Sequence, residues 1–310
     1  MSALKVSRRR NMKILLSIVI ANYNYGRFLS DAIESILAQC DAPLKDPLGC
    51  TILPIRGCKE AVELIICDAE STDNSVDIIR KYERSISWWC SEKDGGQSAA
   101  FNKGFSHAHG EWLTWLNADD VLLQGTIKAF AALVRDNRTA IWVTGNKLHF
   151  DSDTQRIISI NWGPHSMPPL ISRRHDFSAV YGPTTFFKRK LYEQMGPIDE
   201  RLHYAMDSEY WARVTLAGIR QTRLRHICWG FRDHEESKTA GVQSEDVINR
   251  REKETIYWHR KLNFYFPVSA TNPWYVYWCL WRIIDGSWVK RYFLKWRYEG
   301  KMFNKDREYK

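Results

Sequence analysis

The segment Leu15-Leu-Ser-Ile-Val-Ile-Ala21, followed directly by Asn22-Tyr-Asn24, decides the fold of this 310-residue chain. A run of seven residues with a single polar member predicts a strand that is buried on both faces, as in a parallel sheet. A second strand of this kind is predicted at Glu63-Leu-Ile-Ile-Cys-Asp68, and it also ends on a polar residue. Both strands therefore end in side chains that suit a binding site better than a core.

Helical patterns alternate with these strands along the chain. Apolar residues at 29, 33, 36 and 37 recur at the spacing of one helix face. Further helices are predicted over 76–82, 97–107 and 126–134, and further strands over 86–89, 112–116 and 141–144. Residues 41–60 are rich in Pro, Gly and Cys without a period, which predicts an irregular insertion. Strands interleaved with helices predict an α/β sandwich with a mostly parallel sheet.

The net charge of +9 is concentrated at the two ends of the chain. Residues 1–13 carry five basic residues and no acidic ones, and residues 250–310 carry 14 basic and 6 acidic residues, which leaves residues 14–249 at −4. This distribution argues against a nucleic-acid partner, because a uniformly basic surface is missing. We therefore divide the chain into a basic arm (1–13), a catalytic domain (14–240) and a helical, aromatic and basic extension (241–310).

The cysteines and the apolar runs bear on the cellular setting. Seven cysteines form no C-x-x-C pair, so neither a zinc knuckle nor a redox motif is predicted, and a reducing setting fits best. The apolar run at 14–21 is short for a signal peptide, and no segment reaches the roughly 20 apolar residues of a membrane span. We expect a cytoplasmic protein that is peripheral on the inner face of the membrane.

Three polar clusters follow predicted strands: Asn22-Tyr-Asn24, Asp68 and Asn117-Ala-Asp-Asp120. Ligands of parallel α/β sheets bind beyond the carboxyl ends of the strands, so we expect these clusters to converge on one edge. Paired aspartates there suit a hard divalent cation, which prefers oxygen ligands. Two alternatives remain open: Asp119-Asp120 as the N-cap of the helix near Thr126, and Asp68 as a turn-capping residue.

Seven motifs in order resemble the family 2 inverting glycosyltransferases of the GT-A fold, over roughly residues 14–240. The first four lie at 17–24, Cys67-Asp-Ala-Glu-Ser-Thr-Asp-Asn-Ser75, Asp94-Gly-Gly-Gln-Ser-Ala-Ala-Phe-Asn-Lys-Gly104 and Trp115-Leu-Asn-Ala-Asp-Asp120. The others are Gly196-Pro-Ile-Asp-Glu200, Tyr204-Ala-Met-Asp-Ser-Glu-Tyr-Trp211 and Phe231-Arg-Asp-His-Glu-Glu-Ser-Lys-Thr239.

The resemblance implies a role for each matching position. It places the nucleotide base against Tyr23 and the backbone near Ala21, with Asp68 on the base or ribose. It places the nucleotide and its diphosphate along Asp94, Gln97 and Asn102 and beside Asn117 and Ala118. Asp119 matches the metal-binding member of the family's D-x-D motif, and His234 falls where some relatives have a metal or phosphate contact, with Lys238 nearby. Asp207 matches the catalytic base.

The chain departs from the family pattern at three positions. Ala21 stands where the family often has Pro, and Met206 stands where it often has Glu before the base. Asn117 replaces the first carboxylate of D-x-D, and it can offer a carbonyl oxygen instead. A divalent cation, Mg²⁺ or Mn²⁺, is still expected, because it stabilises a departing diphosphate as a Lewis acid.

The acceptor hydroxyl is a poor nucleophile and needs a carboxylate within hydrogen-bond reach. Asp207 is predicted to deprotonate it from the face opposite the leaving group, which inverts the anomeric centre. The alternative is that Asp207 only begins the helix through Tyr210, Trp211 and Val214, since aspartate is common in a first turn. For Trp115, Tyr204 and Trp211, core packing is favoured over stacking on a sugar.

The C-terminal extension carries an amphipathic pattern. If residues 288–298 form a helix, Trp288, Val289, Tyr292, Phe293 and Trp296 share one arc and Lys290, Arg291, Lys295 and Arg297 the other. Leu294 and Tyr298 interrupt the basic side. Such a helix suits the interface of an anionic membrane, and the nearly apolar stretch Trp274–Ile284 would be buried in protein or lipid. The alternative is that the extension packs on the catalytic domain.

These features lead to one main functional hypothesis and two others. The main one is sugar transfer from a UDP-, GDP- or dTDP-linked donor to a glycan or lipid-linked acceptor, in polysaccharide or glycolipid synthesis. A sugar-nucleotide nucleotidyltransferase usually needs a Gly-rich basic loop after the first strand, where this chain has one glycine within residues 22–27. A non-catalytic, membrane-tethered module that binds sugar nucleotides is the third reading, and the fold alone does not decide among them.

Overall fold

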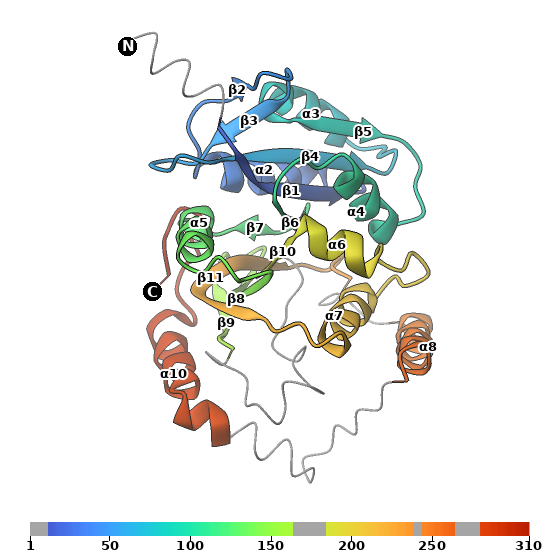
Figure 1. Cartoon of the computed structure of the whole chain (residues 1–310). Coiled ribbons are helices and arrows are strands. Elements are labelled where there is room, and N and C mark those ends of the chain that lie inside the picture. The colour runs from blue at the N-terminus through green and yellow to red at the C-terminus, as the bar shows by residue number, and fades with distance from the viewer. Residues whose placement is uncertain (1–11, 164–183, 239–243, 264–279, 310) are drawn as a thin grey trace.

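Strand β1 (Ile14–Asn22) lies inside an 11-stranded sheet and confirms the strand expected over Leu15–Ala21. Its residues from Leu15 onward are all buried, because helices cover both faces of the sheet (Figure 1). The protein is described by a computed structural model that covers residues 12–163, 184–238, 244–263 and 280–309. The α/β architecture predicted from the sequence is therefore confirmed.

The remaining elements follow in chain order. The helices are α2 (Gly26–Leu37), α3 (Ser75–Tyr82), α4 (Gln97–Ser106), α5 (Thr126–Asp136), α6 (Arg189–Met195), α7 (Met206–Leu216), α8 (Glu245–Lys261) and α10 (Ser287–Tyr298). The strands are β2 (Leu44–Lys45), β3 (Thr51–Pro54), β4 (Ala61–Asp68), β5 (Trp88–Ser91), β6 (Trp112–Asn117), β7 (Val121–Leu122), β8 (Trp142–Asp151), β9 (Ile157–Asn161), β10 (Thr185–Lys188) and β11 (Thr222–Asp233).

Alternate residues of β1 feed two separate cores. Ile18 and Ile20 pack with α2, α3 and α5 on one face, and Val19 and Ala21 pack with α4, α6 and α7 on the other. Trp211 of α7 is stacked between Trp115 and Trp142 of the sheet, with ring centroids 5.6 and 5.2 Å apart. The packing role expected for Trp115 and Trp211 is therefore what the structure shows, and it fixes α7 to the sheet.

The sheet is mixed, whereas a mostly parallel one was expected. Parallel pairing joins β5, β4, β1 and β6, and it joins β8 to β11. Between these two groups lies β10, which runs antiparallel to both β6 and β8. The difference arises because β10 has only four residues and lies far along the chain from β6 and β8. No local sequence pattern therefore predicts its place in the sheet.

Residues 41–60 are not wholly irregular, which corrects the prediction for this segment. β2 pairs with β3, and β3 pairs antiparallel with β4 through Leu53 and Pro54, so the segment adds an edge to the sheet. Thr51 to Ile55 are buried. A proline is tolerated at position 54 because it lies beyond Thr51 and Ile52, the residues of β3 that pair with β2, so one side of its backbone needs no amide hydrogen.

The C-terminal elements pack on the rest of the molecule. Trp258 of α8 is part of the core that contains α7, and Leu294 and Tyr298 of α10 are buried against β9. Residues 1–11 of the predicted basic arm, and 274–279 of the apolar stretch Trp274–Ile284, lie outside the described residues. Within the described residues, no helix combines the length and apolarity needed to cross a bilayer.

Candidate active site

The three polar clusters that follow β1, β4 and β6 meet at one edge of the sheet, as predicted. Asn22 is in register with Asp68 on one side of β1, and Ala21 is in register with Asn117 on the other. All three strands run parallel, so their carboxyl ends point the same way. Residues that are nearly 100 positions apart in the sequence thus become neighbours.

A cavity of about 1470 Å³ opens at this edge. Its volume exceeds the roughly 300–1,000 Å³ of a pocket for one small ligand, which leaves room for two substrates. Eight of the eleven candidate residues from the sequence line it: Ala21, Tyr23, Asp94, Gln97, Asn117, Ala118, Asp119 and Asp207. Asp68, Asn102 and His234 are not among the described residues of its wall.

Asp68 organises the loop that follows β4. Its buried carboxylate accepts hydrogen bonds from Asn22 (2.6 Å), from the Ser71 hydroxyl (2.5 Å) and from Ser91 (2.6 Å). It also accepts the Ser71 amide at 3.0 Å, so the turn-capping alternative describes its geometry. Residues 69–72 of that loop line the cavity. Asp68 therefore influences the cavity indirectly, by holding the loop that lines it.

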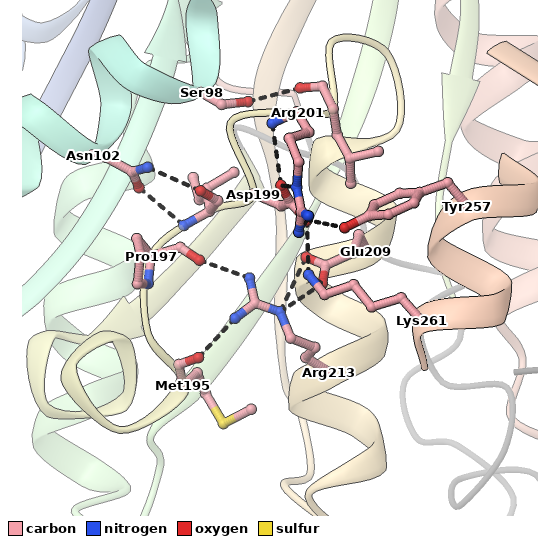
Figure 2. Close-up of polar contacts among 12 residues, drawn as sticks. Ser98, Asn102, Met195, Pro197, Asp199, Arg201, Glu209, Arg213, Tyr257 and Lys261 are labelled. Atoms are coloured by element: carbon pink, nitrogen blue, oxygen red, sulfur yellow. Dashed lines mark hydrogen bonds and ion pairs between the residues drawn. The ribbon is translucent and has the colours of Figure 1, made fainter. Parts of the chain in front are cut away.

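Asn102 links α4 to the segment that precedes α7. Its amide nitrogen donates to the Ile198 carbonyl at 2.9 Å, and its oxygen accepts the Ile198 amide at 2.9 Å. The same oxygen accepts the Tyr192 hydroxyl at 2.9 Å. Figure 2 shows Asn102 with two of its hydrogen bonds. These bonds give Asn102 a structural task near residue 198.

Asp119 and Asp120 point to different partners. The Asp119 carboxylate lies 3.1 Å from Nε2 of His234, while Asp120 accepts the Arg232 amide at 3.0 Å and the Asn117 side chain at 2.8 Å. Burial, with the charge of Asp119 second, raises the pKa of Asp120 well above its ordinary value. The N-cap of α5 is Gly125, without a side-chain cap, so the capping alternative for this aspartate pair is wrong.

The contact between Asp119 and His234 fits two ligands of one metal ion. Ligand atoms held about 2.1 Å from an octahedral ion, at right angles, lie about 3 Å apart. Within the described residues, no group of three or more His, Cys, Asp and Glu side chains is placed to hold a metal. Asp119 and His234 would thus supply two ligands, and Mg²⁺-type sites complete their coordination with water and substrate phosphates.

A chain of side chains connects Asn117 to Lys238, which is half-buried. The Gln97 amide donates to Asn117 Oδ1 at 2.9 Å, and Lys238 Nζ donates to Gln97 Oε1 at 3.1 Å. Burial lowers the pKa of Lys238 to about 8. Burial also raises the pKa of Asp94, which accepts the Gly96 amide at 2.7 Å. Lys238 thus places a positive charge beside amide groups in this part of the wall, which suits a bound anion.

Asp207 stands in the first turn of α7, on the side of the cavity that faces β8 and β11. Its carboxylate accepts the Ser208 amide at 2.7 Å. Burial raises the pKa of Asp207, and the nearby Lys147 of β8 opposes that rise. A carboxylate whose pKa is shifted toward neutrality is a stronger proton acceptor than an ordinary one. The position of Asp207 in the first turn of α7 is compatible with both hypotheses, that it begins the helix and that it acts as a base.

The structure adds wall residues that the sequence did not single out. Lys147, Trp229 and Phe231 come from β8 and β11, and the lysine nitrogen lies 5.1 and 5.3 Å from the two ring centroids. Arg251, Thr255 and Trp258 come from α8. Because alternate residues of a strand face the same side, the sequence of β11 could have indicated that Trp229 and Phe231 point inward. The α8 residues belong to no motif, and they lie beyond the end of the catalytic domain predicted at residue 240.

Comparison with known proteins places this cavity in context. Residues 17–196 match the family profile described as glycosyl transferase family 2. An uncharacterized glycosyltransferase of Nostoc is 37% identical over 109 residues, which is 34% of this chain and 28% of that protein. The chain spans only 28–57% of the length of three such curated relatives.

Two solved structures share the fold. TarS of S. aureus in complex with UDP-GlcNAc aligns with a TM-score of 0.54 at 16% identity, over 78% of this chain and 66% of that one. The mannosyltransferase PcManGT of Pyrobaculum calidifontis, in complex with GDP-Man and Mn²⁺, aligns with a TM-score of 0.53 at 18% identity, over 81% and 65%. At this identity the likeness concerns the fold.

Proposed function

The chain belongs to glycosyl transferase family 2, and on that premise we propose that it moves a sugar from a nucleotide-diphosphate donor to an acceptor hydroxyl with inversion. One observation carries the proposal. Asp119 and Asp207 come from different elements and line the same large cavity, at the edge where the parallel strands end. Two carboxylates in one cavity suit the two tasks of the reaction, which are holding the leaving diphosphate and activating the acceptor.

The donor is assigned to the side of the cavity formed by β1, β4 and β6. Ala21 and Tyr23, with the loop over 69–72, are assigned to the nucleotide base and ribose. Asp94, Gln97, Asn117 and Lys238 are assigned to the diphosphate region, where Lys238 supplies a positive charge. Since TarS binds UDP-GlcNAc and PcManGT binds GDP-Man, a UDP- or GDP-linked donor is supported for this fold, and dTDP remains a candidate.

A divalent cation is assigned to Asp119 and His234. The 3.1 Å contact between their ligand atoms is the separation expected around one ion. When bound, the ion supplies Lewis-acid stabilisation to the diphosphate. A nitrogen ligand is softer than carboxylate oxygen and favours a transition metal over Mg²⁺, and PcManGT was solved with Mn²⁺.

Asp207 is assigned as the general base. The acceptor oxygen forms a bond to the anomeric carbon, the bond from that carbon to the phosphate oxygen breaks, and its electron pair leaves with the diphosphate. The acceptor proton passes to the Asp207 carboxylate. Direct displacement inverts the anomeric centre, and it needs no nucleophilic residue on the enzyme.

Two other functions are weighed against this one. A nucleotidyltransferase lacks support, because the segment after β1 contributes a single glycine and is bonded to Ser71 and Asp73 through Asn24 and Gly26. A binding module without turnover would not need a half-buried carboxylate with a raised pKa opposite the donor side, which is what Asp207 provides.

A thermal-shift screen tests the proposal. The full chain is heated with UDP-, GDP- and dTDP-linked sugars, each with Mn²⁺, with Mg²⁺ or with EDTA. The true donor raises the midpoint by mass action, and most strongly with the preferred ion. Product assays with that donor then separate an enzyme from a binding module. If no nucleotide sugar shifts the midpoint under any of these conditions, the donor assignment is wrong.

We also propose that α10 rests on an anionic membrane surface. Leu294 and Tyr298 are buried on the protein, but five aromatic and aliphatic residues of α10 are exposed, including Trp296 at 80%. Residues 280–296 hold eight of the fifteen exposed large hydrophobic side chains in the described residues, which marks a concentrated patch. Residues 280–301 carry six basic and two acidic residues, a charge that complements anionic lipid.

Vesicle co-sedimentation tests this surface with the full chain. Removing aromatic area by Trp288→Ser with Trp296→Ser should weaken binding to phosphatidylglycerol-containing vesicles by roughly tenfold or more. Ile248→Ser with Ile256→Ser removes exposed apolar side chains from α8 and serves as the matched control. Equal binding by both double variants would contradict the assignment. A truncation before α8 is unsuitable, because α8 forms part of the cavity wall.

A further inference from the structure

The carboxylate of Glu254, on α8, occupies a concave run of three successive backbone amides directly before α7. Oε1 accepts the His203 amide at 3.0 Å, and Oε2 accepts the amides of Tyr204 at 2.7 Å and Ala205 at 3.1 Å. The Glu254 residue is only 7% exposed. Successive amides that converge in this way form an anion-binding concavity, and here the protein fills it with its own side chain.

These amides lie at the base of the helix that carries Asp207. α7 begins at Met206, with Ala205 as its N-cap, and Ala205 has no side-chain cap. The direction of Asp207 therefore depends on the backbone at residues 203–205, which Glu254 holds from 49 to 51 positions away in the chain. The Arg251 guanidinium lies 4.9 Å from the Tyr204 ring centroid and adds a second contact from α8.

The C-terminal end of α8 contacts α7 at Glu209, about one turn after residues 203–205. Lys261 Nζ donates to Glu209 at 2.7 Å and to Asp199 at 2.8 Å, and the Tyr257 hydroxyl donates to Asp199 at 3.1 Å. Glu209 is fully buried and also accepts Arg213 Nε at 3.0 Å. Figure 2 shows Lys261 and Tyr257 reaching from α8 toward Asp199 and Glu209. α8 thus contacts α7 on both sides of Asp207.

We propose that Glu254 is a positioning residue for the base Asp207, so that α8 is an integral part of the active site. The proposal rests on the proposed function, because it concerns the base of that reaction. Its role differs from that of a general stabiliser in one respect. The Glu254 charge lies at the positive end of the α7 dipole, where a negative charge of Asp207 would otherwise be favoured more strongly.

Removal of this charge should change the ionisation of Asp207. A neutral residue at 254 leaves the helix end uncompensated, which stabilises ionised Asp207 and lowers its pKa. Lys147 of β8 faces Asp207 and is unchanged by the substitution. Arg250 donates to Glu254 at 3.3 Å, and His203 and Lys238 carry charge interactions with Glu254. The acidic limb of the kcat–pH profile reports Asp207, because the base must be ionised to accept the acceptor proton.

Glu254→Gln in the full chain is the test, with the nucleotide sugar found by the thermal-shift screen. kcat should fall about 10- to 100-fold through misplacement of the base. The affinity for the donor should stay within about twofold, and the acidic limb of the kcat profile should move down by roughly half a pH unit. Glu254→Asp keeps the charge but retracts the carboxylate, so it should lower kcat and leave the limb in place.

Glu63→Gln is the matched control. Glu63 is a fully buried carboxylate that also accepts two successive amides, those of His109 and Gly110, but it lies at the opposite end of β4 from the cavity. The Glu63→Gln substitution should lower the thermal midpoint without changing kcat or the acidic limb of the kcat–pH profile. The proposal is overturned if folded Glu254→Gln, or folded Glu254→Asp where the glutamine variant does not fold, keeps wild-type kcat.

Failure of the underlying function has a different signature. If Asp207→Asn retains wild-type transfer, the assignment of the base is wrong and Glu254 has nothing to position. If Asp207→Asn is inactive and Glu254→Gln keeps the wild-type kcat, then only the role of Glu254 is refuted.

Discussion

The two sides of the cavity are built by opposite means. The side to which we assign the donor comes mainly from the ends of three parallel strands in register, and apart from Lys238 its wall residues fall between positions 21 and 119. The side to which we assign the acceptor comes from β8, β11, α7 and α8, and its wall residues lie between positions 147 and 258. The donor side is therefore encoded in short motifs at strand ends, whereas the acceptor side exists only after distant helices have packed together.

Asp207→Asn should separate the two sides most strongly. The amide cannot accept the acceptor proton, so kcat should fall by about 10³- to 10⁴-fold. Donor affinity should stay nearly unchanged, because Asp207 is not among the residues assigned to the donor. Initial rates together with calorimetric donor binding measure both effects. Asp246→Asn, an exposed carboxylate in the first turn of α8, is the control and should leave both values intact. Wild-type activity of Asp207→Asn would end the base assignment.

Asp119→Ala should damage the donor side instead. Loss of a charged ligand removes metal-dependent stabilisation worth several kcal/mol, so donor binding with Mn²⁺ should weaken by about a hundredfold. The test compares donor affinity with Mn²⁺ and with EDTA in wild type and variant. The wild type should respond to EDTA and the variant should not. An undiminished response to the metal in Asp119→Ala would place the ion elsewhere.

The same contrast explains how far the sequence could be interpreted without a structure. The apolar run 15–21 and the polar residues after it are local signals, so β1 and the edge were predicted correctly, and most of the candidate residues line the cavity. Asp68 and Asn102 were placed in the right region, but the partners that occupy their polar atoms come from residues 22, 71, 91 and 198. Hydrogen-bond saturation of this kind is a tertiary property.

The wall formed by α7 and α8 and the short strand β10 could not be predicted from the sequence. β10 is a four-residue strand between β6 and β8, and its place depends on pairing with strands about 40 and 70 residues away. Leu294 and Tyr298 seemed to interrupt a basic helix face, yet they anchor α10 in a core with Ile157 and Phe150. No sequence signal indicates the proposed role of Glu254, because an acidic residue in a highly charged helix is normally expected to face solvent.

Lys238 joins the two sides, and its titration should give the smallest effect. Its ammonium group contacts Gln97 on the donor side, and its carbonyl accepts Arg251 of α8. The charged form, which attracts the diphosphate, predominates below the pKa of about 8 and is lost above it. Donor affinity should therefore decline as the pH rises through 8, by at most about tenfold per pH unit. Lys238→Arg keeps the charge and should flatten this decline, whereas Lys238→Met should bind weakly and equally at every pH. Calorimetry of donor binding from pH 6.5 to 9.5 distinguishes these three curves. If the wild-type affinity stays constant from pH 7 to 9, Lys238 does not bind the diphosphate, and its contacts with Gln97 and Arg251 are structural only.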